Sequence, residues 1–186
     1  MNDQKKIHPY KFTLWIAIGS ILMMFAGLTS AYIVKRNMAN WSLVEMPSIF
    51  WISTFCILVS SITIYFAKKL FVKRKMLEYR VLFGLTAVLG ILFLILQIVG
   101  FFSYKSLDIK LIGAGSNASY SFLLAIALLH GVHVLGGVIA LIVVFLKGLN
   151  NSSRNYSTVP IDVVSIYWHF VDLLWIYLFV FFNIMK

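Results

Sequence analysis

The stretch from Ser165 to Lys186 reads SIYWHFVDLLWIYLFVFFNIMK, and it decides the fold class. Almost all of its residues are apolar or aromatic, which suits a helix that crosses a lipid bilayer. His169 and Asp172 nevertheless lie well inside it, three residues apart. Such groups are rare in membrane segments because they lose their hydration there. The stretch therefore predicts a transmembrane helix that carries a buried polar site.

The composition of the whole chain agrees with a membrane protein. Of its 186 residues, 61% are hydrophobic and 12% are charged, and the mean hydropathy is +0.93. Soluble domains carry roughly 25% charged residues. The net charge of +10 does not indicate a nucleic-acid partner, because the Lys and Arg residues form short clusters between apolar runs. A single cysteine, Cys56, rules out a disulfide framework or a Cys-based metal site within the chain.

Five apolar runs follow one another along the sequence. They cover residues 12–34, 48–67, 81–104, 120–146 and 163–185. About 20 helical residues span the hydrocarbon core, so each run is long enough. The runs lack the alternation of polar and apolar residues that marks β-barrel strands. The sequence therefore predicts an all-α fold, a single membrane domain of residues 1–186 with five transmembrane helices.

The distribution of positive charge predicts the orientation of this bundle. Loops rich in Lys and Arg stay in the cytoplasm. The N-terminal tail and the segments 68–80 and 147–162 share one side of a five-helix bundle and hold 11 of the 16 Lys and Arg residues. We therefore expect a cytoplasmic N-terminus and a C-terminus outside.

Small and polar residues recur along the runs at helical spacing. Small side chains let helix backbones approach closely in lipid, so we expect helix contacts at Gly27, Gly90, Gly136 and Gly137. Gln97 belongs to a polar stripe on the third run. A packing seam is the simpler interpretation of that stripe, and a polar path through the bundle is the alternative.

Four ionisable side chains in the last two runs form the candidate site. His130 and His133 share one face of the fourth helix, and His169 and Asp172 share a face of the fifth. A rise of about 1.5 Å per residue places His133 and Asp172 near the bilayer midplane. A lone carboxylate there costs about 2.5–3.5 kcal/mol. We therefore expect a buried, hydrogen-bonded cluster in which His169 and Asp172 face the fourth helix.

Three roles for this cluster stay open: a structural network, a proton relay or lipid-headgroup contact, and axial ligation of a haem by facing imidazoles. The chain has four histidines, too few for di-iron histidine boxes, and one carboxylate in its runs, too few for di-iron carboxylate chemistry. It shows no nucleophile with its base, no phosphate-binding glycine loop and no cofactor fingerprint. No catalytic, cofactor-binding or metal-binding residue is predicted.

Longer motifs in the same helices resemble those of a known family. YWHFVDLLWIYLFVFF (167–182) is similar to the C-terminal signature of subunit III of the haem–copper terminal oxidases, and HGVHVLGG (130–137) to its H-G-x-H-V-x-x-G motif. The stretches FAGLTSAY, SSIT and LTAVLGILFLILQ also match, in the family's order and over nearly the whole chain. The chain is most similar to the short bacterial form with five helices.

This resemblance implies a non-catalytic subunit of a proton-pumping oxidase in aerobic respiration, a multi-pass protein of the bacterial inner membrane. The haems and copper would lie in partner subunits, and this chain would hold no cofactor beyond bound phospholipid. It would pack on subunit I, with subunits II and IV as further partners, and would support proton uptake and oxygen access. Cytochrome c oxidase is favoured, with quinol oxidase as the alternative. A stand-alone bis-histidine cytochrome or a channel is the competing class.

Two acids that are common in the family are missing. Ile21 stands where the first of these helices commonly has a buried Glu, and Gly100 stands where the third commonly ends with one. A role that the family assigns to those carboxyl groups does not transfer to this chain. Their absence favours a scaffold over an essential proton relay.

Overall fold

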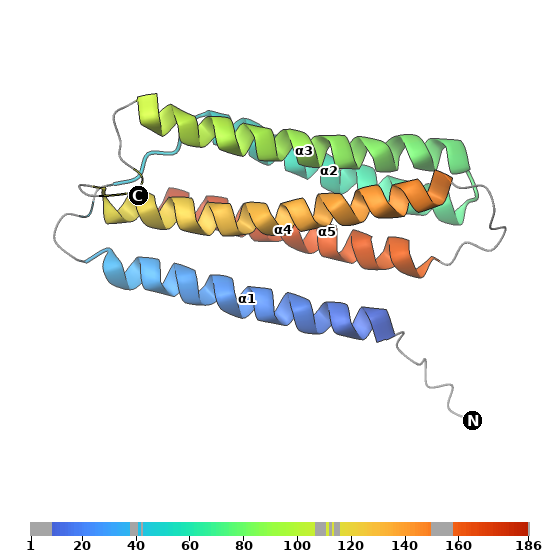
Figure 1. The fold of residues 1–186 in the computed structure, drawn as a ribbon, viewed down its shortest axis with the longest axis horizontal. Helices are drawn as coiled ribbons and strands as arrows, with labels where there is room; N and C mark the ends of the chain where they lie inside the picture. The colour runs from blue at the N-terminus through green and yellow to red at the C-terminus, as the bar shows by residue number, and fades with distance from the viewer. Residues whose placement is uncertain are drawn as a thin grey trace.

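The computed structural model describes residues 9–37, 41, 43–106, 111, 113, 116–149 and 158–185, and the regular structure in these ranges is entirely helical. The five helices are α1 (Pro9–Lys35), α2 (Ile49–Val72), α3 (Met76–Ser106), α4 (Ala118–Leu149) and α5 (Val159–Ile184). Figure 1 shows them running side by side along one long axis. Each is long and apolar enough to cross a membrane, which confirms the predicted fold class.

Several helices continue beyond the apolar runs. α2 ends at Val72, so Lys68 and Lys69 stand on the helix rather than in a loop. α3 begins at Met76 and α5 at Val159, each before the start of its apolar run. Long basic side chains can extend from a helix end toward water while the backbone keeps its hydrogen bonds. The edge of an apolar run therefore does not mark the end of the helix.

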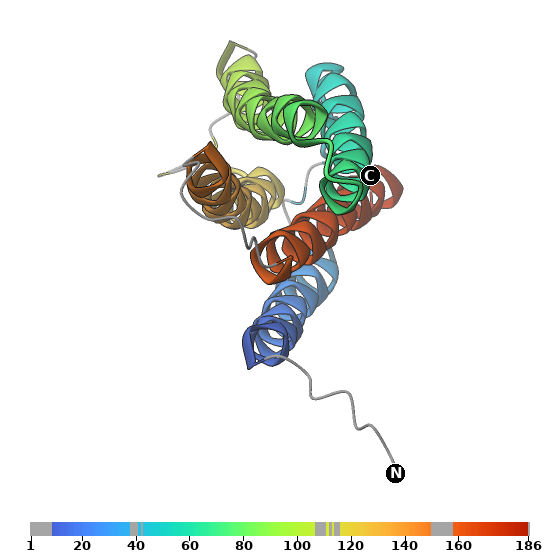
Figure 2. The ribbon, with the colours of Figure 1, turned by 90° about the vertical axis from the view of Figure 1, so that its right-hand side faces the viewer.

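Four helices form a closed bundle, and α1 packs against its outside. α2 contacts α3 and α5, and α4 also contacts α3 and α5. Among the described residues α1 contacts α4 and α5 alone, as the end-on view in Figure 2 shows. Half of the most apolar part of α5 is buried, against 22% for α1. α5 is therefore the central helix of the fold.

The helix directions place charged residues together at one end of the bundle. The start of α1 lies at the same end as the short turn between α2 and α3 (Figure 1). Arg74 makes this turn tight by adopting a left-handed conformation with φ 61°. We name this the basic end, because Lys11, Lys68, Lys69 and Lys147 all lie there, near the starts of α1, α3 and α5 and the ends of α2 and α4.

Candidate functional site

Trp168 of α5 joins four helices at the centre of the bundle. Its ring lies where α3 and α4 carry glycines. A Cβ added to Gly90 would lie 2.5 Å from the Cη2 atom of Trp168, and one added to Gly137 would lie 3.0 Å from its Cε3 atom. The indole N–H donates a hydrogen bond of 3.0 Å to Ser60 Oγ on α2. Gly90 and Gly137 are thus the places where the bundle makes room for this side chain.

The other two glycines expected at helix contacts lie in looser surroundings. A Cβ added to Gly27 would meet no atom within 4 Å, and one added to Gly136 would meet only the Tyr167 hydroxyl, at 4.0 Å. The expected contact is therefore wrong for Gly27. The reason is that α1 packs on α4 and α5 through larger residues of another face, among them the buried Phe25 and Thr29.

His130 lies in a box of aromatic rings. Its imidazole is fully buried and stacks on the ring of Trp175, with 5.2 Å between centroids. Phe25 and Phe93 present their rings edge-on at 6.3 and 6.0 Å. Within the described part of the chain, neither ring nitrogen has a hydrogen-bond partner. His130 therefore packs as an aromatic side chain rather than as a member of a polar network.

His133 bonds within its own helix. Its Nδ1 atom lies 2.7 Å from the carbonyl oxygen of Leu129 and donates to it. The carbonyl of His133 in turn accepts a hydrogen bond of 3.0 Å from the Tyr167 hydroxyl on α5. The contact between α4 and α5 at this position uses the backbone of His133 rather than its imidazole.

His169 faces α2. Its Nδ1 atom lies 2.7 Å from the Oγ atom of Ser61. Asp172, one turn further along α5, is 2% exposed, and neither carboxyl oxygen has a hydrogen-bond partner among the described residues. Ser61 is therefore bonded to His169 and not to the carboxyl group of Asp172.

His130, His133, His169 and Asp172 do not form one hydrogen-bonded cluster, although each pair shares a face of its helix. The expectation that His169 faces the fourth helix is wrong, because its partner Ser61 belongs to α2. The physical reason is the central place of α5, which contacts α1, α2 and α4. Helical spacing shows which residues share a face, but not which neighbour that face meets.

Gln97 lies in a polar seam between α2 and α3. Its Nε2 atom donates a hydrogen bond of 3.0 Å to Ser53 Oγ. Further along the same seam, the hydroxyl oxygens of Thr63 and Thr86 lie 2.8 Å apart. Hydrogen bonds of this kind hold helices together in lipid, where no hydrophobic force does so. The arrangement is that of a packing seam.

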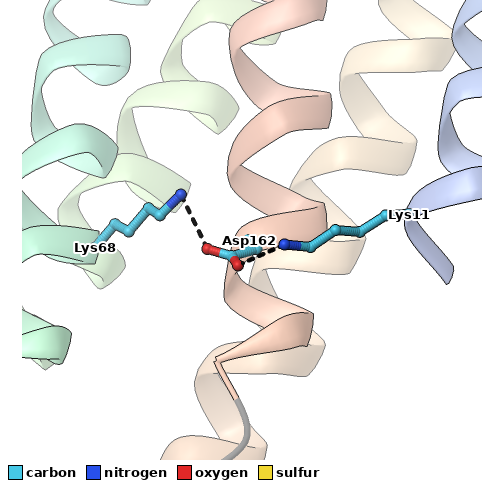
Figure 3. A network of polar contacts seen from close by, with 3 residues as sticks. All are labelled: Lys11, Lys68 and Asp162. Atoms are coloured by element: carbon cyan, nitrogen blue, oxygen red, sulfur yellow. Dashed lines mark hydrogen bonds and ion pairs between the residues drawn. The ribbon is translucent and has the colours of Figure 1, made fainter. Parts of the chain in front are cut away.

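The sequence pattern did not predict an ion-pair network that the structure has at the basic end. The carboxylate of Asp162, at the start of α5, forms ion pairs with Lys11 of α1 and Lys68 of α2, as Figure 3 shows. The distance from the lysine Nζ atom to the carboxylate oxygen is 2.9 Å in each pair. The network links three helices that are distant in sequence. The available signal was that Asp162 is the only acid in the basic segment 147–162. An acid in basic surroundings is a candidate for an ion pair.

The surroundings of His130 and His169 bear on the alternative of a haem between α4 and α5. No group of three or more His, Cys, Asp or Glu side chains gathers among the described residues. Haem ligation by two facing imidazoles would need open space beside both rings, but three aromatic rings border His130 and His169 faces Ser61 on another helix. His130 and His169 therefore do not face each other across the open space that a haem held by these two rings would need.

Comparison with known proteins gives the family. Residues 10–185 match the family described as cytochrome c oxidase subunit III. The cytochrome bo(3) ubiquinol oxidase subunit 3 of Buchnera aphidicola subsp. Acyrthosiphon pisum (strain APS) is 28% identical over 97% of this chain and 87% of its own length. The cytochrome c oxidase subunit 3 of Bacillus sp. (strain PS3) is 28% identical over 89% and 80%. The probable quinol oxidase subunit 3 of Staphylococcus haemolyticus (strain JCSC1435) is 29% identical over 91% and 85%. Because the match runs through all five helices and agrees with the motifs of α4 and α5, the chain belongs to the subunit III family of the haem–copper oxidases.

Proposed function

We propose that this chain is the non-catalytic subunit III of a proton-pumping haem–copper oxidase in aerobic respiration. The observation that carries the proposal is the family match over residues 10–185, which includes all five membrane-spanning helices. Membership in the family makes the chain part of a multi-subunit oxidase and a multi-pass protein of the bacterial inner membrane. The haems and copper would be held by partner subunits, where oxygen is reduced.

The geometry of the chain suits a scaffold. Several of its buried polar side chains bond across helix contacts, as Trp168 does with Ser60 and Gln97 with Ser53. Large apolar side chains such as Trp15, Trp51 and Phe55 are exposed on the surface of the chain. In a membrane complex these faces meet either lipid or another subunit. Subunit I would be the main contact, with subunits II and IV as further partners.

The proposed role includes binding of phospholipid and support of proton uptake and oxygen access by the catalytic subunits. The proposed orientation has the basic end in the cytoplasm, since Lys and Arg gather there. Reporter fusions test this orientation. A cytoplasmic reporter is expected to be active when fused before α1 and inactive after α5, and the reverse result would contradict the orientation.

For the electron donor, we take cytochrome c oxidase as the first assignment and quinol oxidase as the alternative. The family description and the Bacillus relative carry the name cytochrome c oxidase. The Buchnera and Staphylococcus relatives are named as ubiquinol or quinol oxidase subunits. The donor would bind to other subunits, so its identity has to be measured on the assembled complex.

The test is purification in mild detergent through a tag after Lys186, followed by mass spectrometry and an absorbance spectrum. The expected result is a large haem-bearing, copper-binding subunit that co-elutes with oxygen-reducing activity, and no such material from an untagged strain. Oxidation of reduced cytochrome c, compared with oxidation of a quinol, then separates the two donors. A chain that elutes alone and colourless would overturn the proposal. A chain that elutes alone with a Soret band would instead support a bis-histidine cytochrome.

A further inference from the structure

A groove opens between α2 and α5 at the basic end. Its volume is about 500 Å³. The polar residues that line it are Tyr65, Lys68, Lys69 and Lys73 of α2 and its C-terminal turn, and Ser165 and His169 of α5. The groove therefore lies beside the C-terminal end of α2 and the first half of α5.

Two of its lysines carry unneutralised charge. Lys68 is paired with Asp162 at 2.9 Å. Lys69 and Lys73 are exposed, and within the described part of the chain neither ammonium group makes an ion pair or a hydrogen bond. Two adjacent positive charges beside a cavity attract an anion. A phosphate diester carries one negative charge, which would neutralise one of them and attract the other at short range.

His169 adds a polar group to the wall of the groove. Its Nδ1 atom is engaged by Ser61, which orients the ring. The other ring nitrogen, Nε2, is therefore the atom that remains for a ligand. A phosphate oxygen is a strong hydrogen-bond acceptor and suits an N–H donor at this place.

Exposed apolar side chains lie further along both helices that border the groove. On α2, Ile62 and Phe66 precede the lysines by about one or two helical turns, and on α5 Leu173 follows His169 by four residues. All three side chains are exposed. These side chains can contact acyl chains, whereas a free phosphate ion would leave them uncovered.

We propose that this groove binds the headgroup of an anionic phospholipid, with its acyl chains along Ile62, Phe66 and Leu173. Basic pockets between transmembrane helices on the cytoplasmic side bind such headgroups. A zwitterionic lipid would bring its own ammonium group next to Lys69 and Lys73 and would bind less tightly. The inference deepens the lipid-binding part of the proposed function, on which it rests for the orientation of the basic end, and names both the place and the charge class of the lipid.

The test is titration of the full chain in mild detergent, after delipidation, with binding read by native mass spectrometry. The probes are phosphatidylglycerol, phosphatidylcholine with the same acyl chains, and inorganic phosphate as competitor. We expect phosphatidylglycerol to bind more tightly than phosphatidylcholine, and phosphate not to displace it. In the Lys69→Gln/Lys73→Gln variant the affinity for phosphatidylglycerol should fall roughly 30-fold, since each lysine near an anionic surface contributes a factor of about five.

The matched control is Lys75→Gln, which removes a lysine of the same turn that pairs with Glu78 and lies outside the groove. Its affinity should stay within about twofold, because a charge in solvent is largely screened. The single charge reversal Lys73→Glu provides a second variant if the double variant does not fold. Since binding is read from the mass of chain and lipid, the result stands whether or not an oxidase co-elutes.

Three outcomes would overturn the inference. The first is an unchanged affinity for phosphatidylglycerol in both the double variant and Lys73→Glu. The second is equal binding of the zwitterionic lipid, or displacement by phosphate alone, which would make the groove a site for free phosphate. The third is a cross-link in the assembled complex from Lys69 or Lys73 to an acidic protein segment, with no lipid retained.

Discussion

The ring of Trp168 occupies the space that Gly90 leaves open on α3, and its N–H is bonded to Ser60 of α2. One side chain of the central helix is thereby held by steric fit on one neighbour and by a hydrogen bond on another. Close packing of this kind leaves no room for an added methyl group. The site at which Gly90 faces Trp168 is therefore the most sensitive point for a test of the packing.

Gly90→Ala should destabilise the bundle by about 1–3 kcal/mol, the usual cost of overpacking. The added Cβ would lie 2.5 Å from Trp168 Cη2 and 2.9 Å from Val138 Cγ2. Gly27→Ala is the control, since its Cβ meets no atom within 4 Å and Ala favours the helix by up to about 1 kcal/mol. Thermal unfolding in detergent measures both. Equal stability of the two variants would contradict the packing described for Trp168.

Asp162→Asn should weaken the attachment of α1, because it removes the ion pairs with Lys11 and Lys68. Partly exposed pairs contribute up to about 1 kcal/mol each, and the loss should shrink at high salt. Unfolding temperatures at low and at high salt measure this effect. Glu78→Gln is the control, since it breaks only an exposed pair within three residues, with Lys75. A loss that does not depend on salt would point to packing rather than charge.

Asp172→Leu should cost less than about 1 kcal/mol or even stabilise the chain. Both carboxyl oxygens are buried without a hydrogen-bond partner among the described residues, and removal of such a group relieves its desolvation penalty. Ser61→Ala should instead cost about 1 kcal/mol, since it removes the partner of His169 Nδ1. Chemical unfolding of the two variants decides between them. A larger loss for Asp172→Leu than for Ser61→Ala would restore a structural role for the carboxyl group.

Gly100→Glu, which introduces the acid that is common in the family, should prevent proper packing of α2 on α3. A Cβ at this position would lie 2.9 Å from Ile49 Cγ2 and 2.9 Å from Phe50 Cζ. Gly100→Gln has nearly the same shape without the charge and should fail equally, and Phe50→Ala should partly rescue both variants. Yield of the monodisperse chain is the measurement. If Gln were tolerated and Glu not, the cost of burying charge would be the cause instead.

His130→Phe should keep the chain folded, with a cost below about 1.5 kcal/mol. The phenyl ring preserves the stack on Trp175 and the edge contacts with Phe25 and Phe93, and no described hydrogen bond of the imidazole is lost. His130→Ala should cost about 3–5 kcal/mol, as for other large aromatic residues reduced to Ala. The two unfolding curves should therefore separate widely. Equal losses in both variants would show that the imidazole nitrogens are needed.

Much of the fold could be predicted from the order of residues alone. An apolar run of about 20 residues has few alternatives to a membrane helix, because every backbone polar group must be satisfied within the segment. The two glycines that receive Trp168 were also visible, since Gly90 and Gly137 stand at helical positions where close approach is expected. The family motifs of the last two helices lie in the same sequence.

Which side chains of different helices contact one another could not be predicted in this way. His169 and Asp172 share a face of α5, yet His169 bonds to Ser61 on α2 and His130 packs against Trp175 rather than entering a polar cluster. Asp162 forms an ion pair with Lys11, which is 151 residues away in the chain. Periodicity determines which side chains share a face, because it is a property of one helix. Only the simultaneous packing of all five helices decides which partner that face meets, because α5 is in contact with three of the other helices.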